Sequence, residues 1–143
     1  MTGEIFESIH KVRTFECDFY GHVNNAIYLN YLEFARMELL ESRGLHLTRL
    51  KEMGLMLVIR RVEIWFKSPA LAQEQLAIRT SVKEYRRASG TFHQKIVRLP
   101  DEKLIAEADV NWVVVNLQGK PVAIPPVISE ALGLEHSHKK ATS

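Results

Sequence analysis

The chain has 143 residues, of which 46% are apolar and 25% charged, a composition typical of one globular domain that buries a core without disulfides or metals. Its formal net charge of +2 argues against a nucleic-acid-binding protein but suits an anionic small ligand. The single cysteine, Cys17, excludes an internal disulfide and fits a reducing, cytoplasmic compartment, and no apolar run is long enough to span a membrane.

The first predicted element is a strand over residues 9–17, with residue 4 as its earliest start, because the segment is rich in strand formers with partial alternation. A turn is predicted over residues 18–25, where Gly21 and two asparagines lie. The chain therefore changes direction just before its most regular segment.

That segment is a helix predicted over residues 25–43. Asn24 or Asn25 is suited to cap its start, and Gly44 is a typical helix end. Apolar residues share one broad face at helical spacing, which indicates that another part of the protein wraps around the helix: Ile27, Tyr28, Tyr31, Leu32, Phe34, Ala35 and Leu39.

The rest of the chain is predicted to form a short helix over residues 47–53, a short terminal helix over residues 126–134, and four strands. The strands are expected at residues 55–67, 75–85, 91–99 and 103–116. Their short connections favour antiparallel hairpins, so the elements predict the α+β class, with a five-stranded antiparallel sheet facing one long central helix. A single domain is expected over residues 1–135, followed by a flexible tail over residues 136–143.

The most specific motif is Asp-x-x-Gly-His-Val-Asn-Asn at residues 18–25, preceded by Glu16. It resembles the signature of the 4-hydroxybenzoyl-CoA thioesterase family of hotdog proteins, and the piece Gly-His-Val-Asn-Asn-x-x-Tyr is also similar to plant-type acyl-ACP thioesterases. The resemblance extends over nearly the whole chain. It implies a hotdog fold, in which the sheet wraps around the helix, and hydrolysis of an acyl-CoA or acyl-carrier-protein thioester. No cofactor is expected.

Asp18 is the predicted centre of the chemistry. It lies just before a helix N-terminus, where unpaired backbone amides and the helix dipole favour a negative charge. Such a carboxylate is suited to attack a thioester carbonyl or to activate a water, while nearby amides polarise the carbonyl oxygen. The alternative is an acidic residue that only stabilises the helix.

Other residues of the motif have roles that the sequence leaves open. Gly21 allows a tight turn and close approach of a ligand, and Tyr20 is placed with it in the substrate-binding set. His22 is suited to orient Asp18, to donate to substrate or to protonate the leaving thiolate, and its alternative is a turn histidine bonded to backbone. Asn24 and Asn25 contact substrate or water, or simply cap the helix.

Two further sets follow from the resemblance. It places a backbone donor of the second strand near Val58 or Ile59, from the same subunit or from the other one. It also places Arg86, Arg87 and Ser89 at the phosphates and pantetheine of CoA, where arginines bind bidentately. The alternative for this second set is a solvated hairpin tip. Relatives pair edge to edge, so a homodimer or homotetramer is expected, with pairing that removes an exposed sheet edge.

Several alternative functions remain. Cys17 is adjacent to Asp18, but alternation along a strand turns it toward the core, which disfavours a catalytic thiol. A hydratase or dehydratase of the same fold is disfavoured because Asp18 and His22 stand at Asp-x3-His spacing. A non-enzymatic acyl-thioester-binding protein would keep the same pocket. No Gly-x-Ser-x-Gly elbow is present, and the pair His136-x-His138 lacks the partners of a metal site.

Overall fold

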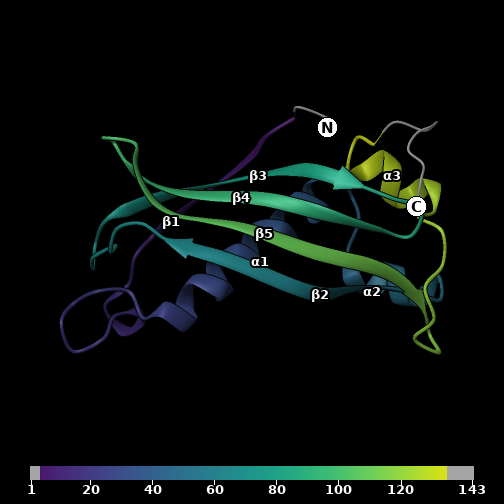
Figure 1. The fold of residues 1–143 in the computed structure, drawn as a ribbon, viewed down its shortest axis with the longest axis horizontal. Coiled ribbons are helices and arrows are strands. Elements are labelled where there is room, and N and C mark those ends of the chain that lie inside the picture. The colour runs from purple at the N-terminus through teal and green to yellow at the C-terminus, as the bar shows by residue number, and fades with distance from the viewer. Residues whose placement is uncertain (1–3, 135–143) are drawn as a thin grey trace.

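A computed structural model describes residues 4–134 of the chain. Its elements, in chain order, are β1 (Phe6–Lys11), η1 (Thr14–Glu16), α1 (Asn25–Ser42), α2 (Leu47–Glu52), β2 (Leu55–Phe66), β3 (Gln75–Tyr85), β4 (Ser89–Leu99), β5 (Lys103–Asn116) and α3 (Pro126–Ala131). The strands form one antiparallel sheet in the order β1-β3-β4-β5-β2 (Figure 1). The predicted α+β class and five-stranded antiparallel sheet are confirmed. The predicted tail lies outside the described residues.

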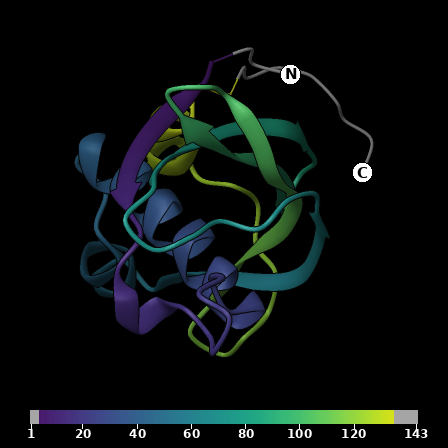
Figure 2. The ribbon, with the colours of Figure 1, turned by 90° about the vertical axis from the view of Figure 1, so that its left-hand side faces the viewer.

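α1 lies within the curve of the sheet (Figure 2). Asn24 caps it, as its side chain accepts from the amide of Ala26, and Gly44 follows its end at a φ of 77°. The helix face that meets the sheet is buried and consists of Tyr28, Tyr31, Leu32, Ala35, Leu39 and Leu40. The apolar periodicity of the sequence therefore identified the face that carries the core.

β5 supplies the opposing layer. Its even-numbered residues from Ala106 to Val114 are at most 1% exposed, whereas Glu107, Asp109 and Asn111 point to the outer face and are half-buried. This is the alternation that a strand covered on one face requires. The largest fully buried side chain, Trp112, belongs to this layer.

The start of the chain differs from the prediction. The first strand ends at Lys11, and residues 14–16 form a 3-10 turn instead of continuing the strand to residue 17. The turn is closed by hydrogen bonds from the amide of Cys17 to the carbonyl of Thr14 (3.1 Å) and from the amide of Arg13 to the carboxylate of Glu16 (2.9 Å). A side-chain acceptor three residues ahead thus competed with the strand ladder.

Smaller differences affect other boundaries. β4 begins at Ser89, two residues before its predicted start, because Ser89 and Gly90 already pair with β5. The last helix ends at Ala131 instead of residue 134. Boundaries of this kind depend on pairing partners that local sequence does not specify.

β2 is an edge of the sheet, and one side of its backbone has no partner strand within residues 4–134. Large apolar side chains are exposed along it: Val58, Ile59, Val62, Trp65 and Phe66. A long apolar edge strand is a surface that pairs readily with another strand.

The helices within residues 4–134 are too short or too polar to cross a lipid bilayer.

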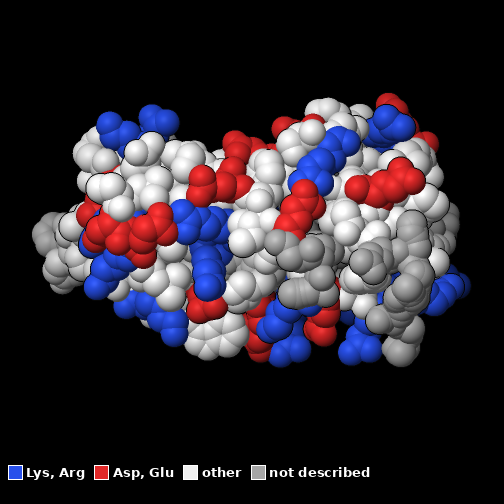
Figure 3. All heavy atoms as spheres, turned by 90° about the horizontal axis from the view of Figure 1, so that it is seen from above, with Lys and Arg blue, Asp and Glu red and all other residues white. Residues whose placement is uncertain are grey.

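Charges are mixed over the surface, in keeping with the small net charge. Figure 3 shows Lys and Arg side chains interspersed with Asp and Glu over the face seen from above. Arg79, for example, bonds both Glu7 (2.8 Å) and Glu102 (2.7 Å). That face presents no continuous basic surface.

Candidate active site

The segment between η1 and α1 forms a compact turn. The amide of Asp18 donates to the carbonyl of His22 (2.7 Å), the amide of Gly21 donates to the carbonyl of Asp18 (3.0 Å), and Cys17 forms a bridge with Val23. Gly21 has a φ of 81°, a conformation that side chains with a Cβ rarely adopt. The chain can reverse direction here because Gly21 adopts a positive φ, and the bridge between Cys17 and Val23 closes the turn.

The carboxylate of Asp18 is held by its own turn. Its Oδ1 accepts hydrogen bonds from the amides of Tyr20 (2.9 Å) and His22 (3.2 Å). Within residues 4–134, its Oδ2 accepts no hydrogen bond. The side chain therefore has one fixed oxygen and one oxygen open to a ligand.

Within residues 4–134, no amide of α1 bonds the carboxylate of Asp18, which the sequence placed just before the helix start. The cap of α1 is Asn24, six residues later. Its side chain accepts a hydrogen bond from the amide of Ala26 (2.9 Å), and its backbone carbonyl accepts one from the amide of Ile27 (2.8 Å). The amides of the turn, not those of the first helical turn, hold the carboxylate. The spacing of the motif did not reveal that a separate turn intervenes.

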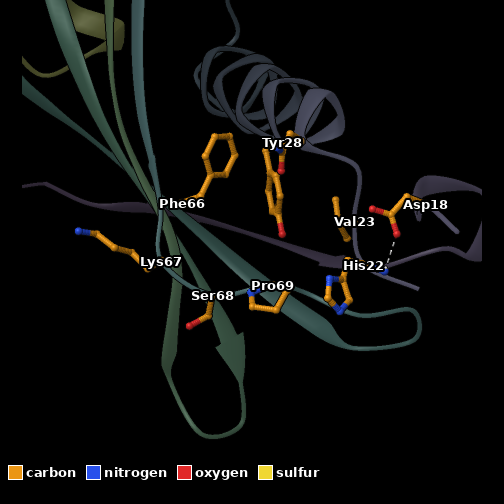
Figure 4. Close-up of a pocket in the computed structure, with 9 residues that line it drawn as sticks. Asp18, His22, Val23, Tyr28, Phe66, Lys67, Ser68 and Pro69 are labelled. Carbon is orange, nitrogen blue, oxygen red and sulfur yellow. Dashed lines mark hydrogen bonds between the residues drawn. The ribbon is translucent and has the colours of Figure 1, made fainter. Parts of the chain in front are cut away.

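A pocket of about 260 Å³ lies beside this turn (Figure 4). Three of the predicted site residues line it, namely Asp18, His22 and Asn25. The remaining lining residues were not assigned to a site from the sequence: Val23, Tyr28, Phe66, Lys67, Ser68 and Pro69. Tyr28 was identifiable as part of the motif, but the segment 66–69 reaches the pocket only through the pairing of β2 with β5.

Aromatic side chains form the apolar wall of the pocket. The ring of Phe66 faces Tyr28 with centroids 5.5 Å apart, and Lys67 points away from both (Figure 4). The hydroxyl of Tyr28 accepts from the amide of Ala70 (3.1 Å). Burial raises the pKa of Tyr28, although the bond from Ala70 opposes the rise. Tyr28 thus presents a neutral phenol to this wall.

The other residues of the motif have structural positions. The imidazole of His22 lines the pocket, and the backbone of His22, not its ring, bonds Asp18. Tyr20 is 79% exposed and contributes its amide, while its side chain lies outside the lining of the pocket. Asn24 is the helix cap. The structure therefore places His22 and Asn25 in the site and gives Tyr20, Gly21 and Asn24 roles in shaping it.

The two sets of residues that the resemblance adds, at the backbone donor and at CoA, lie far from Asp18 within one chain. Val58 and Ser89 both pair with Val113, and Ile59 pairs with Trp112, whereas Phe66 at the pocket pairs with Ala106. Val58 and Phe66 are eight positions apart in β2, and a bulge after Ile59 reduces this to seven steps along the partner strand, which is roughly 23 Å. Figure 1 shows the end of β3, which leads to Arg86 and Arg87, opposite the end where α1 begins. One chain does not bring these residues to the pocket.

Cys17 is unsuited to nucleophilic catalysis. It packs against the core, and its Sγ donates to the carbonyl of Arg13 (3.7 Å). Burial, with the negative charges of Glu16 and Asp18 beside it, raises the pKa of the Cys17 thiol. The reactive thiolate is disfavoured, although Cys17 follows a 3-10 turn and does not lie in the strand on whose alternation the sequence prediction depended.

Replacing Asn24 with alanine is expected to lower the free energy of unfolding by about 1 kcal/mol, because the amide of Ala26 loses its cap. Asn24→Asp keeps the acceptor and is expected to retain stability. Urea unfolding curves check both values. If Asn24→Asp loses catalytic rate at unchanged stability, the side-chain amide takes part in the chemistry that the sequence assigned to it.

Comparison with known proteins places these features in a family. Residues 12–132 match the model of the thioesterase-like superfamily. The chain is 33% identical over 126 residues to the chloroplastic acyl-acyl carrier protein thioesterase ATL3 of Arabidopsis thaliana, covering 88% of this chain and 66% of that protein. It is 30% identical to the long-chain acyl-CoA thioesterase FadM of Escherichia coli, covering 85% of this chain and 92% of that protein.

A solved structure has the same fold. The 1,4-dihydroxy-2-naphthoyl-CoA thioesterase Slr0204 from Synechocystis superposes with a TM-score of 0.86 at 20% identity, covering 91% of this chain and 96% of that one. The family model covers most of the chain, including the turn of Asp18 and the end of β2 that lines the pocket. The chain belongs to the thioesterase-like superfamily.

Proposed function

We propose that the protein hydrolyses an acyl thioester of CoA or of an acyl carrier protein to the free acid and a thiol. The observation that carries the proposal is the carboxylate of Asp18, which has one oxygen fixed by two backbone amides and the other open beside the pocket. A fixed carboxylate next to a ligand space is suited to attack the carbonyl or to activate a water. The names of the relatives support thioester chemistry.

Two further groups complete the proposed reaction. Asn25 lines the pocket and is the first residue of α1, so its backbone N–H group has no carbonyl within the helix to bond. We assign this amide to the developing oxyanion, where the helix dipole assists it. The imidazole of His22, on the same pocket, is assigned to protonation of the leaving thiolate.

The complete site is proposed to form between two chains that pair through β2. Antiparallel pairing of two copies of this edge reverses the strand direction, so the Val58 end of one β2 lies beside the Phe66 end of the other. The partner's Ile59, Arg86, Arg87 and Ser89 are then carried toward the pocket of Asp18. The exposed apolar edge supports this homodimer, from which a homotetramer is built.

The wider setting is part of the same proposal. The sheet that curves around α1 is assigned to the hotdog fold (Figure 2). A reducing, cytoplasmic compartment is supported by the single free cysteine.

The dimer is expected to dissociate when Val62 on the β2 edge is replaced by lysine, because each copy brings a charge into the apolar interface. Sedimentation velocity at micromolar concentration measures the mass, and thiol release measures activity on the same samples. Ile5→Lys is the matched control, since Ile5 is exposed next to β1 at the other edge of the sheet. A wild-type monomer that is fully active would overturn the shared site.

The function is tested with a panel of short, long and aromatic acyl-CoA and acyl-pantetheine thioesters, with the release of free thiol followed by a disulfide reagent. Hydrolysis of at least one thioester, with little hydrolysis of the matching oxygen ester, is the expected result. Binding of acyl-CoA without thiol release would leave a non-enzymatic acyl-thioester-binding protein. An enoyl-CoA assayed beside the panel would indicate a hydratase if its enoyl absorbance is lost without thiol release.

A further inference from the structure

A half-buried carboxylate lies two residues before Asp18. Glu16 ends η1, and its side chain is 12% exposed. Its Oε1 accepts from the hydroxyl of Tyr31 (2.8 Å) and the amide of Arg13 (2.9 Å), and Nε2 of His10 lies 3.0 Å from the same atom. Three donors thus converge on one oxygen atom next to the turn that carries the proposed catalytic group.

These donors come from three different parts of the fold. His10 belongs to β1, Arg13 to the loop that follows it, and Tyr31 to α1. The ring of His10 is held against Tyr31, with centroids 4.6 Å apart, and against Phe34 at 5.4 Å. Tyr31 is only 2% exposed, so the donor that it presents has little freedom to move. Glu16 therefore joins the turn to the sheet and to the helix.

The main chain at Glu16 forms the other half of this connection. Its carbonyl accepts from the amide of Asn24 (3.0 Å), and the next residue, Cys17, bridges Val23. Both ends of the turn that holds Asp18 are thereby tied together at Glu16. A shift of Glu16 would move the start of the turn relative to the first residues of α1, where Asn25 lines the pocket.

Glu16 remains charged in this setting. Burial opposes its negative charge, but the bonds from Arg13, His10 and Tyr31 outweigh burial and hold the pKa of Glu16 below its ordinary value. Burial and the bond to Glu16 raise the pKa of Tyr31. Glu16 does not line the pocket of Asp18, so it is placed to act through the turn and not on the substrate.

We propose that Glu16, held by His10 and Tyr31, is a positioning residue that fixes the Asp18 turn against α1 and β1 in the geometry that thioester cleavage requires. This inference rests on the proposed function. Misplacement of a reacting group by about 1 Å lowers rates by about 10²-fold. Loss of Glu16 is therefore expected to lower kcat far more than it changes KM.

The test compares Glu16→Ala and Glu16→Gln with Glu33→Ala, whose side chain is exposed on α1. All variants are assayed well below their melting temperatures, so that each sample is folded. Glu16→Ala is expected to lose about 10²-fold in kcat with KM changed by less than about threefold. Glu16→Gln, which keeps an oxygen acceptor for Tyr31 and Arg13, is expected to regain most of that loss, and Tyr31→Phe to lie between the two.

Amide hydrogen exchange of Gly21 and His22 gives a readout that does not depend on activity. Both amides lie in the turn and are hydrogen-bonded, so they are expected to exchange at least about tenfold faster in Glu16→Ala and at the parent rate in Glu33→Ala. Unchanged exchange, or a Glu16→Ala variant that loses only stability and keeps its kcat, overturns the inference. If the parent cleaves no thioester, the proposed function fails, and exchange alone decides whether Glu16 holds the turn.

Discussion

Asp18→Asn is expected to lower kcat/KM for thioester hydrolysis by about 10²–10⁴-fold while the protein stays folded. Asparagine keeps an oxygen that accepts from the amides of Tyr20 and His22, so the turn is retained. It removes the charge of the open oxygen, which has to act as nucleophile or base. Thiol release from the best substrate of the panel measures the loss, and thermal unfolding measures the fold.

Glu38→Gln is the matched control for this substitution. Glu38 is an exposed acid on α1 outside the pocket, and its neutralisation is expected to leave the rate unchanged. If Asp18→Asn hydrolyses thioesters as fast as the parent, Asp18 is not the central residue, even though the protein is a thioesterase. If Asp18→Asn and Glu38→Gln lose activity to the same extent, the loss comes from the change in overall charge and not from a specific role of Asp18.

Single turnover in ¹⁸O-labelled water separates the two roles of Asp18. If the carboxylate attacks the thioester carbonyl, a mixed anhydride forms and the thiolate leaves. Water that then attacks the Asp18 side of the anhydride leaves label in that carboxylate. Mass spectrometry of the peptide that contains Asp18 detects it. If Asp18 only activates water, all the label enters the released acid, and hydroxylamine traps no acyl-enzyme.

The sequence predicted elements whose signal is local. The apolar face of α1 and the alternation of β5 repeat with the period of their own secondary structure, so the core residues were identifiable one element at a time. The Asp18 motif was identifiable from its resemblance to a family signature, and its turn and helix cap from the residue preferences of Gly21 and Asn24. The 3-10 turn was missed because it depends on a hydrogen bond that the carboxylate of Glu16 accepts from the amide of Arg13.

The composition of the pocket was not accessible to the same reasoning. Phe66 and Pro69 reach Asp18 because β2 ends beside the start of α1, and that depends on the order of five strands. The separation of Val58 and Ser89 from Asp18 is a matter of register as well. A motif identifies candidate residues, whereas the pairing of strands distant in sequence determines which of these residues lie together at the pocket of one chain.

Gly90→Ala is expected to destabilise the protein by roughly 3 kcal/mol, at the upper end of the cost of overpacking a core. Gly90 in β4 pairs with Trp112 in β5, and a Cβ at Gly90 would lie 2.3 Å from Cζ2 and 2.8 Å from Cε2 of the indole. Trp112 is fully buried and packs against Phe92, with ring centroids 5.8 Å apart. The ring therefore has no open space to enter, and the urea midpoint is expected to fall.

Gly44→Ala separates this steric effect from the general cost of replacing a glycine. Gly44 has a φ of 77° with nothing within 4 Å of an added Cβ, so the expected loss of about 1 kcal/mol is conformational. Combining each variant with Trp112→Leu distinguishes the two causes, because leucine removes the ring atoms that the new methyl meets. The Gly90→Ala pair is expected to lose about 1–3 kcal/mol less than the sum of its parts, and the Gly44→Ala pair to be additive. Additivity at Gly90 would mean that the two strands adjust their spacing, and that Trp112 does not set the close approach of β4 to β5.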